Sequence, residues 1–118
     1  MSNCQLRQDA VRLRLLRYLC EQPNASTRDM AVHLGVSNGA AFYLLKALVD
    51  KGLVKAENFS KSNKKIGYLY LVTPAGVKQK LRLTKQFITI KRAEYNQLRC
   101  EIEAMETELI EAQLWETR

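Results

Sequence analysis

The stretch from Ser37 to Gly52 constrains the fold most, because it is bounded at both ends and has a single apolar face. Ser37 is a favoured residue for capping the start of a helix, and Gly52 stands where a left-handed residue ends one. Ala41, Leu45 and Leu48 recur at positions i, i+4 and i+7, so they share a face that we expect to point at a core. The stretch predicts one amphipathic helix.

A second, shorter helix is predicted just before this one. Ser26 is a cap residue, and Asp29 follows three positions later, where the acid of a capping box belongs. Gly35 fits the glycine that ends a helix, and only two residues separate this helix from Ser37. The expected apolar face consists of Met30, Ala31 and Leu34. Two short helices that meet at a tight glycine turn form a helix-turn-helix.

The N-terminal part predicts a further helix over residues 5–21. Its apolar positions at helical spacing are Leu6, Ala10, Leu13, Leu16 and Cys20. Pro23 and Asn24 break this helix. Arg7, Arg14 and Arg17 fall on another side, where they either lie near phosphates or form a solvated face.

The residues after Gly52 change from a helical to a strand-like pattern. Residues 53–59 form one strand-like run, and residues 66–72 form a second run that is rich in β-branched and aromatic side chains. The polar, lysine-rich residues 60–65 lie between them, so we expect a hairpin with a basic tip. Thr73 as a cap and Pro74 at the first helical position begin another helix.

The C-terminal part predicts a coiled coil. Positions separated by alternating steps of three and four are Leu81, Thr84, Ile88, Lys91, Tyr95, Leu98, Ile102, Met105, Leu109 and Ala112. Residues 85–116 would form a helix about 48 Å long, which is too long to bury on so small a domain. We therefore expect a homodimer, parallel or antiparallel. The expected interface residues are Ile88, Tyr95, Leu98, Ile102, Met105 and Leu109.

Charge and composition indicate the class of partner. The net charge is +7, and residues 1–84 hold 14 Lys and Arg against five Asp and Glu, whereas residues 85–118 hold five against seven. A basic domain points to a polyanion. The start of the chain does not resemble a signal peptide, and no apolar run approaches the roughly 20 residues of a membrane helix. We expect a soluble, cytoplasmic protein with no membrane partner.

The sequence does not favour an enzyme. His33 is the one histidine, and neither a nucleophile motif nor a glycine-rich phosphate loop is present. We expect no cofactor and no metal. The odd number of cysteines, Cys4, Cys20 and Cys100, suits reduced thiols. Cys100 lies outside the coiled-coil seam, which disfavours a disulfide across the dimer.

The predicted order of helix, helix-turn-helix, basic hairpin and helix is the winged-helix pattern. Residues Ser26–Gly76 resemble the DNA-binding part of MarR-type regulators, through HLGVSNGAAFYLLKALVDKGLV and NKKIGYLYLVTPAG. A short chain with one terminal coiled-coil helix is similar to the MarR-like regulators associated with exopolysaccharide genes. The expected fold is mainly α with a small antiparallel β wing. Residues 1–84 would form the DNA-binding domain and residues 85–118 the dimerisation helix.

This resemblance implies that the helix at residues 37–52 enters the major groove of DNA. Asn38 can pair with an adenine, Ser37 can meet a base or a phosphate, and Ala40 can meet a thymine methyl. The candidate base-contacting residues are Ser37, Asn38, Ala40 and Tyr43, of which Tyr43 is also long enough to reach the backbone. The candidate backbone or wing residues are Arg28, Lys46, Lys61, Lys64 and Lys65. A solvated lysine loop is the alternative for the hairpin tip.

The sequence departs from the family pattern in two places. The wing of the family usually carries Asp-x-Arg, whose arginine enters the minor groove, whereas this chain has Asn63-Lys64-Lys65. Lysine keeps the charge but lacks the planar fork of arginine, so minor-groove reading should be weaker. Phe42 and Tyr43 stand where polar or basic residues are common. We expect Phe42 to pack with Leu45 and Val49.

A second function remains open from the sequence. Winged-helix domains also serve as protein-interaction modules, and the chain would then be an adaptor without a DNA site. The basic wing and the concentration of positive charge in residues 1–84 favour DNA. A dimer predicts a pseudo-palindromic site with half-sites about one DNA turn apart. The target genes, the direction of regulation and a small-molecule effector are left open.

Overall fold

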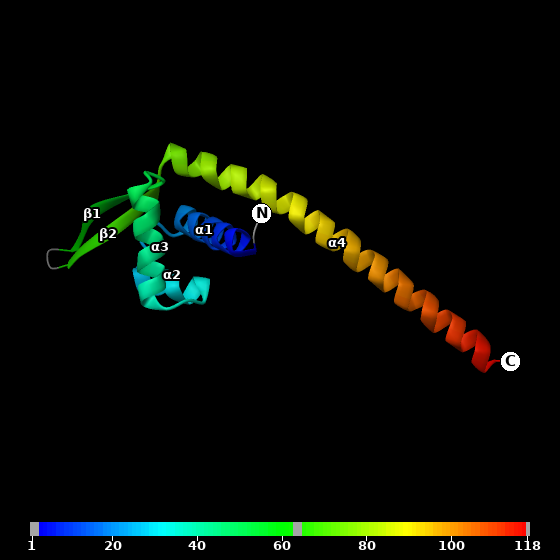
Figure 1. Ribbon diagram of the computed structural model, residues 1–118. Coiled ribbons are helices and arrows are strands. Elements are labelled where there is room, and N and C mark those ends of the chain that lie inside the picture. The colour runs from blue at the N-terminus through cyan, green and yellow to red at the C-terminus, as the bar shows by residue number, and fades with distance from the viewer. Residues whose placement is uncertain (1–2, 63–64, 118) are drawn as a thin grey trace. The chain divides into compact units, whose positions relative to one another are not determined.

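The computed structural model describes residues 3–62 and 65–117, with the backbone alone for residues 3, 59–62, 65 and 66. The elements in chain order are α1 (Asn3–Glu21), α2 (Thr27–Leu34), α3 (Asn38–Asp50), β1 (Val54–Ser62), β2 (Lys65–Val72) and α4 (Pro74–Glu116), as Figure 1 shows. The expected fold class, mainly α with a small antiparallel sheet, is confirmed. The chain divides into two compact units, residues 1–84 and residues 85–118.

Helix α1 supplies much of the core of the first unit. Leu13 and Leu16 are buried as expected, and they are joined by Leu15 and Leu19, which the sequence pattern had not singled out. Cys20 is exposed, so its expected place on the buried face is wrong. Leu15, Leu16 and Leu19 lie at the centre of the buried face of α1. Cys20 lies at the edge of that face, in the last turn of the helix.

Both ends of α2 are held by the bonds that the sequence predicts. The Oγ of Ser26 accepts from the backbone N of Asp29 at 3.1 Å, and the carboxylate of Asp29 accepts from the backbone N of Ser26 at 3.0 Å. Hydrogen bonding to the carboxylate, first by the backbone N of Ser26 and then by the Ser26 side chain, lowers the pKa of Asp29 below its usual value. Gly35 follows in the left-handed conformation, with φ of 70°.

Helix α3 then starts after a sharp change of direction. The chain turns by 106° between α2 and α3, within the range of a helix-turn-helix. Ser37 caps α3 by accepting from the backbone N of Ala40 at 3.1 Å, and Gly52 follows the helix with φ of 75°. The expected inner face is confirmed, because the three residues Ala41, Leu45 and Leu48 are at most 4% exposed. They join the core with residues of α1, α2 and β1.

The hairpin is longer than the sequence pattern predicts. Strands β1 and β2 pair antiparallel from Val54 opposite Val72 as far as Ser62 opposite Lys65, with an irregular register between Ser60 and Ser62. The polar run 60–65 was expected to form the tip of the hairpin, whereas residues 60–62 and residue 65 belong to its strands. Backbone pairing continues through polar residues when the strands form an exposed ribbon, because both faces can keep their polar side chains in water.

One backbone bond attaches this hairpin to the turn between two helices, and a second bond closes the base of the hairpin. The N of Tyr70 in β2 donates to the carbonyl of Pro23, in the turn between α1 and α2, at 2.8 Å. The N of Thr73, just after β2, donates to the carbonyl of Leu53, just before β1, at 3.0 Å. Figure 1 shows the hairpin extending from the three helices α1, α2 and α3 at one edge of the first unit.

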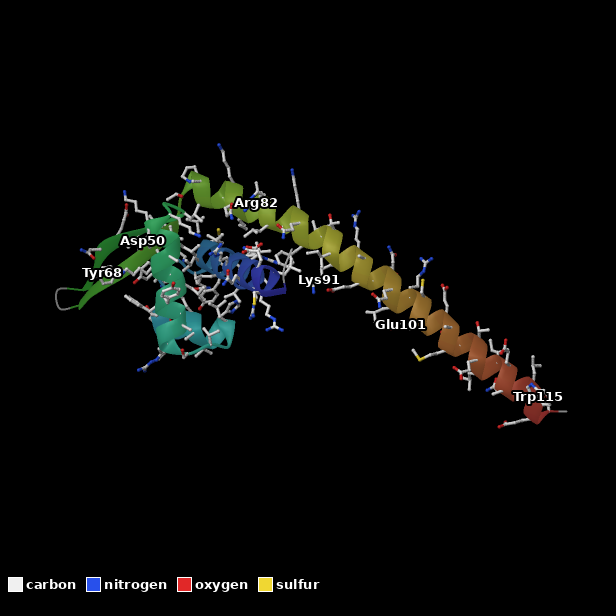
Figure 2. The ribbon with its side chains drawn as sticks, in the orientation of Figure 1. Asp50, Tyr68, Arg82, Lys91, Glu101 and Trp115 are labelled. Atoms are coloured by element: carbon white, nitrogen blue, oxygen red, sulfur yellow. The ribbon has the colours of Figure 1, made fainter. Side chains whose placement is uncertain are left out.

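Helix α4 begins as the sequence predicts. The Oγ1 of Thr73 accepts from the N of Gly76 at 3.1 Å and donates to the carbonyl of Gly52 at 2.6 Å. Leu83 is fully buried. Every residue from 91 to 117 is exposed, and Figure 2 shows side chains such as Lys91, Glu101 and Trp115 along this part of the helix. Among the described residues no single helix is long and apolar enough to cross a membrane. Helices α2 and α3 reach the required length and apolar composition only when they are taken together, and the chain bends sharply between them.

Candidate nucleic-acid interface

The outward face of α3 is the candidate surface for nucleic acid. Gly39, Tyr43 and Lys46 stand at i, i+4 and i+7, two residues out of phase with the buried row. A shift of two residues is about 200° around a helix, so this row lies opposite the core. Tyr43 is 74% exposed, and Lys46 is exposed as well. The core fixes the inner face of α3 while its outer face stays open.

The four expected base-contacting residues lie at different depths. Ser37 and Asn38 are exposed at the start of α3, whereas Ala40 is half-buried. The Oγ of Ser37 accepts the capping bond from Ala40, which leaves its hydroxyl hydrogen to donate to an outside group. The amide of Asn38 can both donate and accept, as pairing with an adenine requires. The first turn of α3 thus offers an amide and a hydroxyl to the outside.

The expected packing of Phe42 with Leu45 and Val49 is wrong. The side chain of Phe42 is 58% exposed. Phe42 follows Ala41 by one residue, about 100° around the helix, which carries its ring off the buried face to one side of α3. Phe42 therefore adds an apolar ring beside the polar outer face, which is a feature that the sequence pattern did not predict.

The expected phosphate contacts come from two helices and from the two strands of the hairpin. Arg28 is exposed at the second residue of α2, and Lys46 is exposed on α3. Lys61 belongs to β1 and Lys65 to β2, so their backbones lie close to the hairpin tip. The side chains of Lys61 and Lys65, and all of Lys64, lie outside the described residues. The sequence therefore puts positive charge on the wing, and the structure gives the backbone positions of two of these lysines.

Helices α1 and α2 are joined by contacts that the sequence did not indicate. The Nη2 of Arg14 donates to the carbonyl oxygen of His33 at 2.9 Å. The rings of Tyr18 and His33 stack, with centroids 4.2 Å apart and planes 23° apart. These side chains, with Arg17 and Glu21, line an open cleft of about 300 Å³. Arg14 thus links α1 to α2, and its side chain is more than part of a solvated face.

A second cleft lies beside the wing. It has a volume of about 400 Å³ and is lined by Asn24, Ala25, Ser26, Thr27, Gly67, Tyr68 and Tyr70. The rings of Tyr68 and Tyr70 stack, with centroids 6.2 Å apart. Burial, and then the neighbouring Tyr68, raise the pKa of Tyr70, so its phenol is neutral at physiological pH. The lining is uncharged, so this cleft does not by itself attract an ion.

The predicted dimer face is apolar and open to solvent in the second unit. The exposed fractions are 46% for Ile88, 65% for Tyr95, 57% for Leu98, 50% for Ile102, 59% for Met105 and 60% for Leu109. Cys4, Cys20 and Cys100 are free thiols, all exposed. Within residues 3–62 and 65–117, no group of three or more His, Cys, Asp or Glu could hold a metal ion.

The capped two-helix turn, the open outer face of α3 and the paired wing together define a winged helix-turn-helix. The family of winged helix-turn-helix DNA-binding domains matches residues 8–55, which include most of α1, all of α2 and α3, and the first residues of β1. No curated protein matches the chain.

Solved structures extend this likeness beyond the matched residues. A point mutant of MepR from S. aureus is 18% identical, with a TM-score of 0.61 over 92% of this chain and 80% of that one. The PcaV transcriptional regulator from Streptomyces coelicolor, in complex with its natural ligand, is 17% identical, with a TM-score of 0.65 over 84% of this chain and 69% of that one. A different MepR mutant, bound to an oligodeoxyribonucleotide, is 18% identical, with a TM-score of 0.58 over 84% of this chain and 78% of that one.

These structures share the fold with this chain at low sequence identity. The resemblance to MarR-type winged-helix regulators is confirmed as a likeness of fold. In this fold α3 is the second helix of the helix-turn-helix, and the β1–β2 hairpin is the wing.

Proposed function

We propose that this protein is a cytoplasmic, sequence-specific transcriptional regulator that binds double-stranded DNA as a homodimer. The observation that carries the proposal is the two-sided character of α3. Its inner row is buried in the core, while its outer row ends in Lys46 and its first turn exposes Asn38. A helix anchored in this way beside a wing can enter a major groove without unfolding the domain.

The first turn of α3 supplies the sequence reading in this proposal. Asn38 pairs with an adenine through its amide, and the hydroxyl of Ser37 donates to a base edge or a phosphate. Tyr43 and Ala40 complete the base-facing set. Lys46 and Arg28 neutralise phosphates on either side of the groove, which fixes the position of the helix but reads no sequence.

The wing and the overall charge supply the remaining affinity. Residues 1–84 hold 14 basic and five acidic residues, so the net positive charge of this unit attracts a polyanion. Lys61, Lys64 and Lys65 extend that charge to the neighbouring minor groove or its phosphates. The DNA-bound MepR mutant, which shares this fold, supports DNA as the polyanion.

The second unit supplies the dimer contact in this proposal. Six large side chains at heptad spacing, from Ile88 to Leu109, are between 46% and 65% exposed. A row of this length is an exposed apolar surface that a second copy of the same helix covers in a coiled coil. Residues 1–84 are then the DNA-binding domain and residues 85–118 the dimerisation helix. Control of exopolysaccharide genes stays a prediction from resemblance.

An adaptor without a DNA site is the second candidate. The observation that favours it is the exposure of two apolar side chains, Phe42 at 58% and Val32 at 79%. Such side chains suit a protein partner better than a phosphate backbone. The positive charge of the same unit favours DNA, and the experiment below separates the two functions.

The test is a titration of the full chain against two DNA duplexes at several salt concentrations. One duplex carries the sequence that the protein enriches from a random pool, and the other is its scrambled version. We expect a preference of about a thousandfold or more for the enriched sequence near physiological salt. Equal affinities with the same salt slope on both duplexes would show charge attraction alone and would favour the adaptor.

A further inference from the structure

Gly39 is the residue at the centre of the outward face in the first turn of α3. It shares its row with Tyr43 and Lys46, and it is exposed. Apart from its two chain neighbours and the adjoining backbone of α3, no atom would lie within 4 Å of a Cβ built on Gly39. Position 39 therefore has room for a larger side chain within this protein.

The usual structural reasons for a glycine do not apply to Gly39. Gly35 and Gly52 have positive φ angles of 70° and 75°, which other residues rarely adopt. A Cβ on Gly76 would collide with the backbone of Leu53. Gly39 has no positive φ and no obstructing neighbour. Alanine is the better helix former, so the fold alone favours alanine at position 39.

A ring packed onto the glycine would be a local explanation. Long side chains on a helix lean toward its N-terminus, so Tyr43 is the residue whose ring can cover Gly39. The ring of Tyr43 is 74% exposed, and none of its atoms comes within 4 Å of the Cβ position. The space beside Gly39 is therefore open, and no side chain of this protein explains the glycine.

We propose that Gly39 is the point of closest approach between α3 and the base edges of the DNA. Glycine permits a backbone to come closer to a ligand than any other residue does. A methyl group at position 39 would hold the first turn away from the groove floor and lengthen the bonds that Asn38 makes to a base. This inference rests on the proposed function and adds an affinity and specificity determinant to it.

The experiment compares the full-length wild-type protein with Gly39→Ala and Gly39→Ser. Each is titrated against the enriched duplex and the scrambled duplex, and each is melted without DNA. We expect Gly39→Ala to raise the melting temperature by a few degrees, because alanine stabilises a helix. We expect its affinity for the enriched duplex to fall about tenfold or more, and that of Gly39→Ser to fall further. Affinity for the scrambled duplex should change little, because non-specific binding rests on phosphates.

Thr107→Ala is the matched control. Thr107 is exposed on α4 in the second unit, and the exchange also introduces a better helix former. It should leave the preference between the two duplexes unchanged.

The outcomes separate the two levels of inference. A wild-type preference that Gly39→Ala retains in full would overturn the role of Gly39 and leave the proposed function standing. A loss of both melting temperature and affinity in Gly39→Ala would show a structural glycine and would also overturn it. A wild-type protein without a preference for any DNA would overturn the proposed function and, with it, this inference.

Discussion

Gly76, in the first turn of α4, lies against the backbone of Leu53, which connects α3 to β1. A Cβ on Gly76 would collide with the carbonyl oxygen of Leu53 and would also come within 2.7 Å of the Cγ1 of Val72. The same carbonyl accepts from the N of Thr73 at 3.0 Å. The segment that follows α3, the base of the wing and the start of α4 therefore meet at one tightly packed point.

Gly76→Ala should destabilise the protein by about 2 kcal/mol, because the added methyl must displace backbone rather than a flexible side chain. Chemical unfolding of the full chain measures this change, with Gly39→Ala as the control for a glycine exchange in open space. Equal stability of Gly76→Ala and the wild type would contradict the close contact.

The capping box of α2 should make stability depend on acid pH. Because the pKa of Asp29 is lower in the folded protein, the charged carboxylate stabilises the fold at a pH above its unfolded pKa. That stabilisation is lost as the pH falls through the folded pKa. We expect Asp29→Asn to remove this part of the acid dependence and Ser26→Ala to cost about 1 kcal/mol at neutral pH. Unfolding free energies measured from neutral to acid pH test both, and an acid dependence unchanged in Asp29→Asn would refute this role of Asp29.

Asn38 and Lys46 should affect DNA binding in different ways. Asn38→Ala should reduce discrimination by about 1–3 kcal/mol and mainly weaken binding to the enriched sequence. Lys46→Ala should weaken binding to the enriched and scrambled duplexes alike and reduce the salt slope by about one. Parallel salt titrations of both variants measure these effects. A uniform loss in Asn38→Ala would place that residue on the backbone instead.

The dimer contact should depend on the seam of α4. Leu98→Asp puts a charge into the centre of the predicted coiled coil, whereas Thr107→Asp puts the same charge outside the seam. Sedimentation equilibrium should show a dimer for the wild type and Thr107→Asp, and a monomer for Leu98→Asp. A dimer that persists in Leu98→Asp would mean that the copies associate through another surface.

Removal of the second unit gives an independent check of the dimer. A chain of residues 1–84 keeps α1, α2, α3 and the hairpin, and it should bind the enriched duplex far more weakly than the full chain does. Circular dichroism should first establish that the shortened chain is folded. Tight binding by a folded monomer would contradict the need for a dimer.

The features that were predictable from the sequence depend on local bonds. The capping box of Ser26 and Asp29 lies within four residues. The end of α2 is predicted from a single residue, Gly35. The inner row of α3 follows from helical spacing alone, and all three of its residues are buried. The order of these local signals was sufficient to predict the winged-helix fold.

The features that were missed depend on contacts between distant parts of the chain. The bond from Arg14 to His33 joins residues 19 positions apart, and composition gives no sign of it. Phe42 is apolar, but its exposure follows from its angle around α3 relative to the core. The length of β1 follows from backbone pairing, which polar side chains do not reveal. Gly39 became informative only when its empty surroundings were known.

The most direct test varies the spacing between the half-sites in the enriched DNA. We expect two half-sites about 10 base pairs apart, bound by one dimer with one recognition helix in each. An insertion of about five base pairs, half a turn of DNA, would put the half-sites on opposite faces and should reduce the affinity to that of a single half-site. Full affinity after the insertion, or an enriched sequence with no second half-site, would contradict a dimeric DNA-binding regulator.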